Sequence, residues 1–342
     1  MPALDIPYTE MYVVDRHKTV EYFTGSFGFE ETAFSESPHV QSSLLRQGAA
    51  HLVVSSGPAT ESFLDEHGDG IADIALACDD VHGTAAAAVA AGGRVLPSDQ
   101  GSVRVSGFGD VRHTLVPSGP EGFASVPADR TWTPARPGST PSAGPAPVLS
   151  LDHIAVCLNA GSLHETVQYY IDGFGCERFY SEYVEVGAQA MDSIVVRSPS
   201  GGMTFTIIEP DAKRSPGQID AFLQRNSGSG VQHLAFLVDD IVAAVREFRS
   251  RGIEFLRTPG PYYDMLADRI PSMTDQISDL SDTNVLADCD EWGYLLQLFS
   301  RSPHERNTLF YELIQRHGAQ GFGSANIRAL YEAVERERVD SE

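Results

Sequence analysis

The sequence has few cysteines, few basic residues and no long apolar run, and each of these absences excludes a class of protein. Its four cysteines lack the paired spacing of a zinc site, so we expect free thiols in a reducing cytoplasm. No apolar stretch approaches the roughly 18 residues of a membrane span, and residues 1–8 carry no features of a secretory signal. The formal charge of −23 argues against nucleic-acid binding, which depends on neutralising phosphates. We therefore expect a cytoplasmic protein that binds neither membranes nor nucleic acids.

What the sequence does contain is three apolar stretches, each typical of a β-strand and each holding one metal-ligand residue. Two His and one Glu, about 80 residues apart from one another, match the 2-His-1-carboxylate triad. That triad holds one face of a non-haem Fe(II) and leaves the other positions for substrate and O2. The stretches are 151–156 with His153, 231–236 with His233 and 309–314 with Glu312.

Taken one at a time, these residues are weak evidence, because a lone His in an apolar strand is more often a hydrogen-bonded core residue. Glu312 is harder to explain in that way, since a buried carboxylate is costly unless it is paired or bound to a metal. Two His and a Glu also build catalytic zinc sites, but the helical His-Glu-x-x-His motif is absent. Ligands spread over three strands favour the open Fe(II) triad.

The chain also contains an internal repeat, in which residues 8–116 and 151–300 follow the same plan. In each copy a strand precedes a helix that ends at Phe-Gly, and a later strand precedes an Asp-Asp pair and a second helix. The pattern predicts a βαβββ unit, two of which would form a curved, half-open sheet with a concave pocket. Glu10 and Asp73 stand in the first copy where the second has its two histidines, so we expect the first domain to be structural.

The predicted fold class is α+β, with tandem βαβββ modules forming two half-open β-barrel domains. We expect an N-terminal domain without metal ligands over residues 1–123 and a linker rich in Pro, Ser, Gly and Ala over 124–149. The C-terminal catalytic domain, with the metal site, would cover 150–342. Within it, residues 327–334 have apolar side chains at i, i+3, i+4 and i+7, which predicts an amphipathic helix.

Five motifs identify a family that this chain resembles. They are GAQAMDS at 187–193, GSGVQH at 228–233, PYYD at 261–264, GYLLQLF at 293–299 and GFGSAN at 321–326. With them, nearly the whole chain resembles the 4-hydroxyphenylpyruvate dioxygenases and the related 4-hydroxymandelate synthases of the vicinal oxygen chelate superfamily. The resemblance implies the vicinal oxygen chelate fold, Fe(II) bound by His153, His233 and Glu312, and a homodimer. It also implies 4-hydroxyphenylpyruvate and O2 as substrates and a C-terminal helix that covers the site as a lid.

In that family the 2-oxo acid is oxidatively decarboxylated, and two activities then diverge. Attack on the ring with migration of the side chain gives homogentisate, whereas benzylic hydroxylation gives 4-hydroxymandelate. Thr206, Ile208 and Ile327 replace the Pro, Asn and Phe of the dioxygenases and resemble the synthase pattern, although drift among core residues would give the same changes. Loss of an amide and of an aromatic face would re-aim the substrate ring, and an error of about 1 Å matters for such chemistry.

The resemblance therefore favours formation of 4-hydroxymandelate for a secondary metabolite such as an antibiotic. The first alternative is a dioxygenase that forms homogentisate. The second is a non-catalytic small-molecule-binding protein on the same fold, against which the retention of all three ligands argues.

The resemblance also implies a substrate pocket with hydrogen-bonding side chains and aromatic walls. Buried amides need partners, so the glutamines are the more telling members of this set. Gly321 and Gly323 would form the hinge of the lid. The predicted pocket residues besides Thr206, Ile208 and Ile327 are Ser193, Gln218, Gln232, Gln297, Phe299, Phe310, Phe322 and Asn326.

Overall fold

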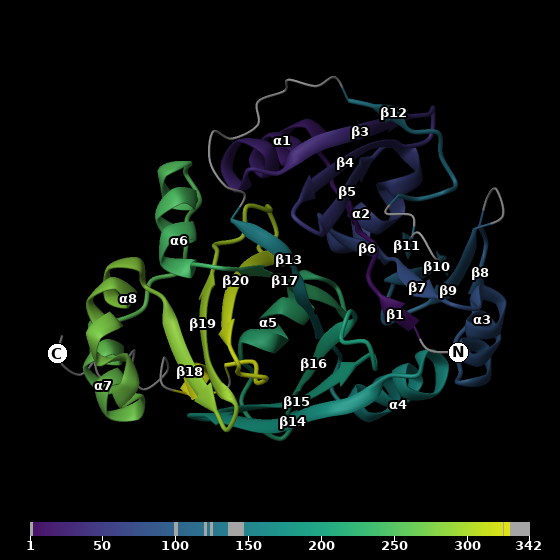
Figure 1. Cartoon of the computed structure of the whole chain (residues 1–342). Helices are drawn as coiled ribbons and strands as arrows, with labels where there is room; N and C mark the ends of the chain where they lie inside the picture. Colours follow the sequence, from purple (N-terminus) through teal and green to yellow (C-terminus); the bar gives the residue numbers. More distant parts are fainter. Residues whose placement is uncertain are drawn as a thin grey trace.

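Two curved sheets, flanked by helices, make up the computed structural model of the chain (Figure 1). The described residues are 3–98, 102–119, 122–123, 126–135, 147–323 and 325–328. One sheet belongs to each copy of the sequence repeat. Each sheet contains both parallel and antiparallel strand pairs, and helices connect some of the strands. The prediction of an α+β protein with two vicinal oxygen chelate domains is confirmed.

The C-terminal sheet has eight strands in the order β14-β15-β16-β13-β17-β20-β19-β18. β13 runs parallel to β16, β17 runs parallel to β20, and β13 and β17 join the two halves as antiparallel neighbours. Each half is thus one βαβββ unit. The strands are β13 (Val148–Cys157), β14 (Glu177–Val186), β15 (Gln189–Arg197), β16 (Thr204–Pro210), β17 (Gly230–Val238), β18 (Leu286–Asp290), β19 (Gly293–Phe299) and β20 (Phe310–His317).

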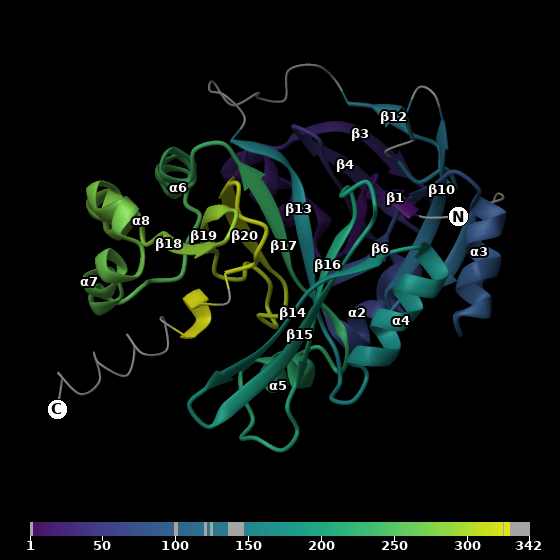
Figure 2. The same cartoon turned by 60° about the horizontal axis from the view of Figure 1, so that its bottom comes forward.

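The helices of this domain distinguish its two units. The first unit has α4 (Leu163–Phe174) after its first strand, and the second has α6 (Ile241–Ser250) in the same place. α5 (Gln218–Arg225) connects the units. The second unit alone has α7 (Gly260–Arg269) and α8 (Ile277–Thr283), which lie beside the last described residues and away from the N-terminal sheet (Figures 1 and 2).

The N-terminal sheet repeats this arrangement. Its order is β1-β7-β10-β6-β2-β5-β4-β3-β12, with β2 parallel to β5 and antiparallel to β6. The main strands are β1 (Ala3–Asp5), β2 (Thr9–Tyr12), β3 (Glu30–Glu36), β4 (Gln41–Gln47), β5 (Ala50–Ser56), β6 (Gly70–Ile74), β7 (Leu76–Cys78), β9 (Val103–Ser106), β10 (Arg112–Gly119) and β12 (Thr133–Pro134). The helices are α1 (Arg16–Glu21), α2 (Glu61–His67) and α3 (Val81–Ala90).

The repeated sequence signals have a local physical cause. Gly28 and Gly175, the glycines of the two Phe-Gly pairs, end their helices with φ of 76° and 70°, a conformation that glycine adopts without strain. Asp80 and Asp240, the second residues of the Asp-Asp pairs, are N-caps of α3 and α6. Each accepts a 2.9 Å hydrogen bond from the backbone N–H three residues further on.

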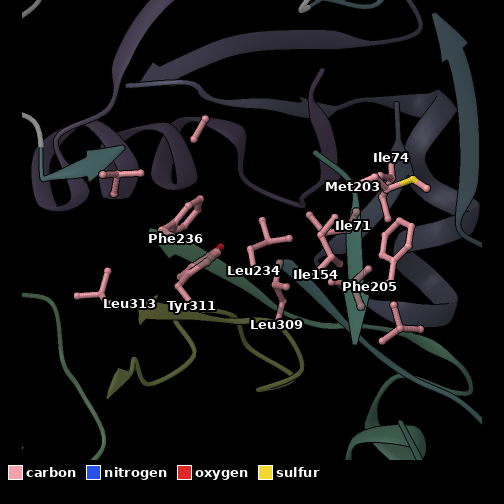
Figure 3. Close-up of a cluster of buried hydrophobic side chains, with 14 of the residues drawn as sticks. Ile71, Ile74, Ile154, Met203, Phe205, Leu234, Phe236, Leu309, Tyr311 and Leu313 are labelled. Atoms are coloured by element: carbon pink, nitrogen blue, oxygen red, sulfur yellow. The ribbon is translucent and has the colours of Figure 1, made fainter. Parts of the chain in front are cut away.

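A large part of the main apolar core lies between the two sheets (Figure 3). Alternation along β17 sends Leu234 and Phe236 into this core, together with Tyr311 of β20, while His233 is directed to the opposite, concave face. Ile71 and Ile74 of β6 enter the core from the other sheet (Figure 3). The sheets therefore pack back to back, which leaves the concave face of each available for a site.

Part of the range predicted as a linker packs on the N-terminal sheet. β12 pairs with Phe34 and Ala33 of β3, and β13 already begins at Val148. The domain boundaries stay a prediction. Among the described residues, no helix combines the length and the apolar character needed to span a bilayer.

Candidate metal centre

The three predicted ligands lie on neighbouring strands at the concave face of the C-terminal sheet. His153 of β13 and Glu312 of β20 both pair with Ala235 of β17, and His233 precedes Ala235 by two residues. Direct partners in a sheet share a face, as do residues two apart in a strand, so the three side chains converge. One ligand atom from each lies within 4.8 Å of the others.

The geometry of this group leaves polar atoms without protein partners. Glu312 Oε2 lies 3.4 Å from Nε2 of His153 and 3.1 Å from Nε2 of His233. All three residues are buried, yet Glu312 Oε1 has no hydrogen-bond partner, and His233 Nε2 faces Oε2 without hydrogen-bond geometry. Buried polar groups are normally satisfied, so these atoms indicate a missing partner. Two imidazoles and a carboxylate fit a divalent metal ion.

The charges of the group also fit a cation. Burial lowers the pKa of His153, but Glu312 and Asp152 outweigh it and raise that pKa to about 9. Burial raises the pKa of Glu312, but the two imidazoles lower it to about 2. Burial lowers the pKa of His233. These directions favour a positive charge at the centre of the group, which fits a bound cation.

Asp152 and Arg316 orient His153, and the sequence analysis did not predict a role for either residue. Asp152 Oδ1 accepts a 2.8 Å hydrogen bond from Nδ1 of His153, which directs Nε2 toward the centre of the group. Arg316 donates 2.8 Å hydrogen bonds to both oxygens of Asp152. Its guanidinium also lies over the ring of Phe322, which contacts the His153 ring edge-on. The signal in the sequence was the acidic residue directly before His153.

Replacing Asp152 by Asn should weaken metal binding about 10- to 100-fold, because the neutral amide loses the charged pairing with Arg316 and orients His153 less firmly. Titration of the metal-free protein with Co(II) measures the affinity. Asp211→Asn, which changes a half-buried carboxylate just after β16 that is bonded to Tyr183, should leave the affinity unchanged. Equal affinities of the two variants would contradict the orienting role of Asp152.

Several predicted pocket residues share the ligand face, as the strand register shows. The ring of Phe310 stacks on His233 with centroids 5.1 Å apart. Thr206 is buried, and its hydroxyl has no hydrogen-bond partner. The register pairs that place these residues are Ala155–Thr206, Ser193–Ile208, His233–Phe310 and Glu312–Phe299. The concave face therefore carries apolar rings around the ligands and an unpartnered hydroxyl further along.

The remaining predicted residues divide into two groups. Gln297 and Asn326 are buried and bonded to each other, whereas Oε1 of Gln232 lies 3.2 Å from Nδ1 of His233. Gln218 is exposed at the start of α5, and Ile327 is 39 % exposed, so their contact with a substrate stays a prediction. Residues 325–328 are helical, and the rest of the predicted lid helix lies outside the described residues.

Ion pairs occupy the corresponding position of the N-terminal sheet. Glu10 of β2 pairs with Asp73 of β6, and both carboxylates are buried. Arg130 donates to Glu10 Oε1 at 2.8 Å, and Arg112 donates to Asp73 Oδ2 at 2.8 Å. Thr114 donates to the same oxygen of Asp73 at 2.7 Å. Guanidinium groups thus balance the acidic residues at the place where the other domain gathers its ligands.

Known proteins are similar to both domains. Sequence profiles of the Glyoxalase/Bleomycin resistance protein/Dioxygenase superfamily match residues 9–108 and 150–279. The 4-hydroxyphenylpyruvate dioxygenase of Yarrowia lipolytica is 30% identical, with 97% of this chain and 91% of that protein covered. The dioxygenase of the same name from Neurospora crassa is 33% identical, with coverage of 81% and 71%.

A solved structure is closer still in sequence. It is a mutant of 4-hydroxymandelate synthase from Streptomyces coelicolor, which is 50% identical and has a TM-score of 0.88. The match covers 99% of this chain and 100% of that chain. On these similarities, and with its buried His-His-Glu group, the chain belongs to the 4-hydroxyphenylpyruvate dioxygenase family of the glyoxalase/dioxygenase superfamily.

Proposed function

We propose that this chain is an Fe(II)- and O2-dependent enzyme that converts 4-hydroxyphenylpyruvate to 4-hydroxymandelate and CO2. The observation that carries the proposal is the buried group of His153, His233 and Glu312 on a face that Ile208 also shares. Fe(II) bound there would activate O2 and polarise the 2-oxo acid of the substrate.

The chain's own residues would bind and orient the substrate. Phe299, Phe310 and Phe322 place aromatic rings next to the ligand imidazoles, where they exclude water from the reacting groups. The unpartnered hydroxyl of Thr206 offers a hydrogen bond to a bound molecule. Ile208 offers none, and an apolar wall there leaves the substrate ring to be placed by shape alone.

Two products remain to be distinguished, and the identities among relatives favour 4-hydroxymandelate. The synthase structure is 50% identical to this chain, whereas the dioxygenases of Yarrowia lipolytica and Neurospora crassa are 30% and 33% identical. Homogentisate formation is the second candidate, because those curated relatives are named as 4-hydroxyphenylpyruvate dioxygenases.

Aerobic turnover of the purified protein with Fe(II), ascorbate and 4-hydroxyphenylpyruvate tests the proposal. The products must be separated by chromatography against standards, since the two acids are isomers and have the same mass. A 4-hydroxymandelate peak supports the proposal, and a homogentisate peak replaces it by the second candidate. If the iron-loaded protein is inert, a non-catalytic binding protein becomes the better description.

The Ile208→Asn variant should shift part of the product toward homogentisate, because it restores an amide on the ligand face. Ile208→Leu changes the shape of the side chain without adding a polar group and should keep 4-hydroxymandelate as the product. Ile327→Phe should act in the same direction as Ile208→Asn if the C-terminal helix closes over the ring. The product ratio is the measurement, and a ratio that none of the variants alters would show that these positions do not steer the reaction.

A cytoplasmic location and a homodimer belong to the same proposal. They rest on the sequence composition and on the family resemblance, and the mass in solution from light scattering tests the dimer.

A further inference from the structure

The second unit of the C-terminal domain has an insertion that none of the preceding arguments uses. α7 and α8 have no counterpart in the first unit, and α7 carries the PYYD motif at 261–264. Tyr262 of this motif is fully buried. Its hydroxyl lies between β18 and the described residues that follow β20, 318–323 and 325–328, which we call the C-terminal segment. There it accepts a 2.9 Å hydrogen bond from the N–H of Ala287 and lies 2.7 Å from Oδ1 of Asn326.

The direction of these hydrogen bonds sets the orientation of two amides. A tyrosine hydroxyl has one proton, and Asn326 Oδ1 is closer to it than the carbonyl oxygen of Ala287, which is 3.0 Å away. With Oδ1 held by Tyr262, Asn326 Nδ2 faces Gln297 and donates to its Oε1 at 3.1 Å. Gln297 therefore has its oxygen engaged, and its Nε2 remains as a donor.

Gln297 is on the face of the sheet that carries the metal ligands. It pairs with Ile314 of β20, two residues beyond Glu312, and precedes Phe299 by two residues in β19. Its amide is packed against Gly323, where an added Cβ would lie 1.6 Å from Oε1. Gly323 also has a φ of +76°, so only glycine allows the C-terminal segment to approach Gln297 in this way.

Other bonds hold the backbone of the same segment. Asp290 Oδ2 accepts from the N–H groups of Gln320 and Gly321, and Asp288 Oδ2 accepts from that of Ala325 at 3.1 Å. Arg316 donates to the carbonyl of Gly321. These bonds end at the backbone, whereas the bond from Tyr262 continues through the Asn326 side chain to Gln297.

We propose that Tyr262 is a positioning residue that, through Asn326, aims the Gln297 amide N–H group at an oxygen of the bound substrate. This inference rests on the proposed function of the site.

A matched pair of variants tests the proposal. Tyr262→Phe and Tyr263→Phe each delete one buried hydroxyl from α7, but the hydroxyl of Tyr263 donates to the carbonyl of Val285 at 3.2 Å and has no bond to Asn326 or Gln297. Tyr262→Phe should raise KM for 4-hydroxyphenylpyruvate about tenfold, as expected for a misaligned hydrogen bond, with a smaller loss in kcat and unchanged iron stoichiometry. Tyr263→Phe should change KM by less than about twofold. Equal values of KM in the two variants overturn the proposal.

A double variant separates positioning from general loosening of the fold. In an Asn326→Leu background the hydrogen bonds that link Tyr262 to Gln297 are already lost. Adding Tyr262→Phe should therefore leave KM at the value that Asn326→Leu alone gives. A further, multiplicative rise in KM would show that Tyr262 acts by another route and would overturn the proposal.

Hydrogen exchange gives a readout that needs no substrate. Tyr262→Phe should speed amide exchange across residues 320–326, and Tyr263→Phe should not. If the wild-type protein forms no product, the proposed function fails, and positioning is then judged by exchange alone. Faster exchange only in Tyr262→Phe supports the positioning role of Tyr262, and equal exchange in both variants overturns it.

Discussion

Glu312→Gln should abolish stable metal binding and lower kcat/KM at least about 10³-fold. The amide carries no charge, and the metal contributes several kcal/mol to catalysis that the two remaining imidazoles cannot supply alone. The substitution is nearly isosteric, so the buried strand should keep its packing. Metal content after anaerobic loading with Fe(II) and desalting, together with O2 consumption, measures both effects.

A control for this variant exists in the other sheet. Glu10 is equally buried in a homologous strand, but its partner is Arg130. Glu10→Gln should therefore retain one iron per chain and near-normal turnover. If Glu312→Gln kept its iron, the group of His153, His233 and Glu312 would not be the metal centre.

Glu10→Gln should also lower the free energy of unfolding of the N-terminal domain by about 3–5 kcal/mol. Removal of the carboxylate leaves the buried guanidinium of Arg130 with Asp129 but without its bonds to Glu10, and breaking a buried ion pair costs about this much. Urea denaturation of Glu10→Gln measures the loss. The double variant Glu10→Gln/Arg130→Met should recover much of it, because no unpaired charge remains.

The pH dependence of stability follows from the same pair. Burial raises the pKa of Glu10, but Arg130 and Arg112 outweigh it and hold that pKa below its usual value. The pairing therefore stabilises the folded chain above the pKa of the unfolded state and is lost as the pH falls through the lower folded value. Wild-type stability should decline below about pH 4, and Glu10→Gln should show a smaller decline. Parallel acid titrations of the two proteins would contradict this assignment.

The convergence of the three candidate ligands could be predicted from the sequence because strand periodicity fixes the face of each side chain. His153, His233 and Glu312 each interrupt an apolar run, and three such interruptions in one repeat leave a metal as the simplest cause. The register of β13, β17 and β20, which the structure adds, brings their ligand atoms within 4.8 Å. The repeat likewise predicted the fold, since its Phe-Gly and Asp-Asp pairs are local helix signals.

Contacts between distant segments could not be predicted in this way. Arg130 lies in a stretch whose composition is typical of a linker, and nothing local shows that its guanidinium balances Glu10. Asp152 and Arg316 are 164 residues apart, so their pairing depends on the tertiary fold. Ile327 was assigned to the pocket by resemblance, but its exposure depends on where the C-terminal helix packs, which helical periodicity does not fix.

Back-to-back packing of the sheets has a consequence for how this active site could evolve. Glu312 and Tyr311 are adjacent in β20, yet Glu312 points to the concave face with the two histidines, and Tyr311 points into the core between the domains. The hydroxyl of Tyr311 lies 2.9 Å from Nε2 of His304. His304 in turn is within 3.1 Å of Asp69 in the N-terminal half. We therefore expect a substitution at the seam between the domains to affect Glu312 through β20 without entering the pocket. The N-terminal half of the repeat therefore offers selection a remote means of adjusting the geometry of the candidate metal centre.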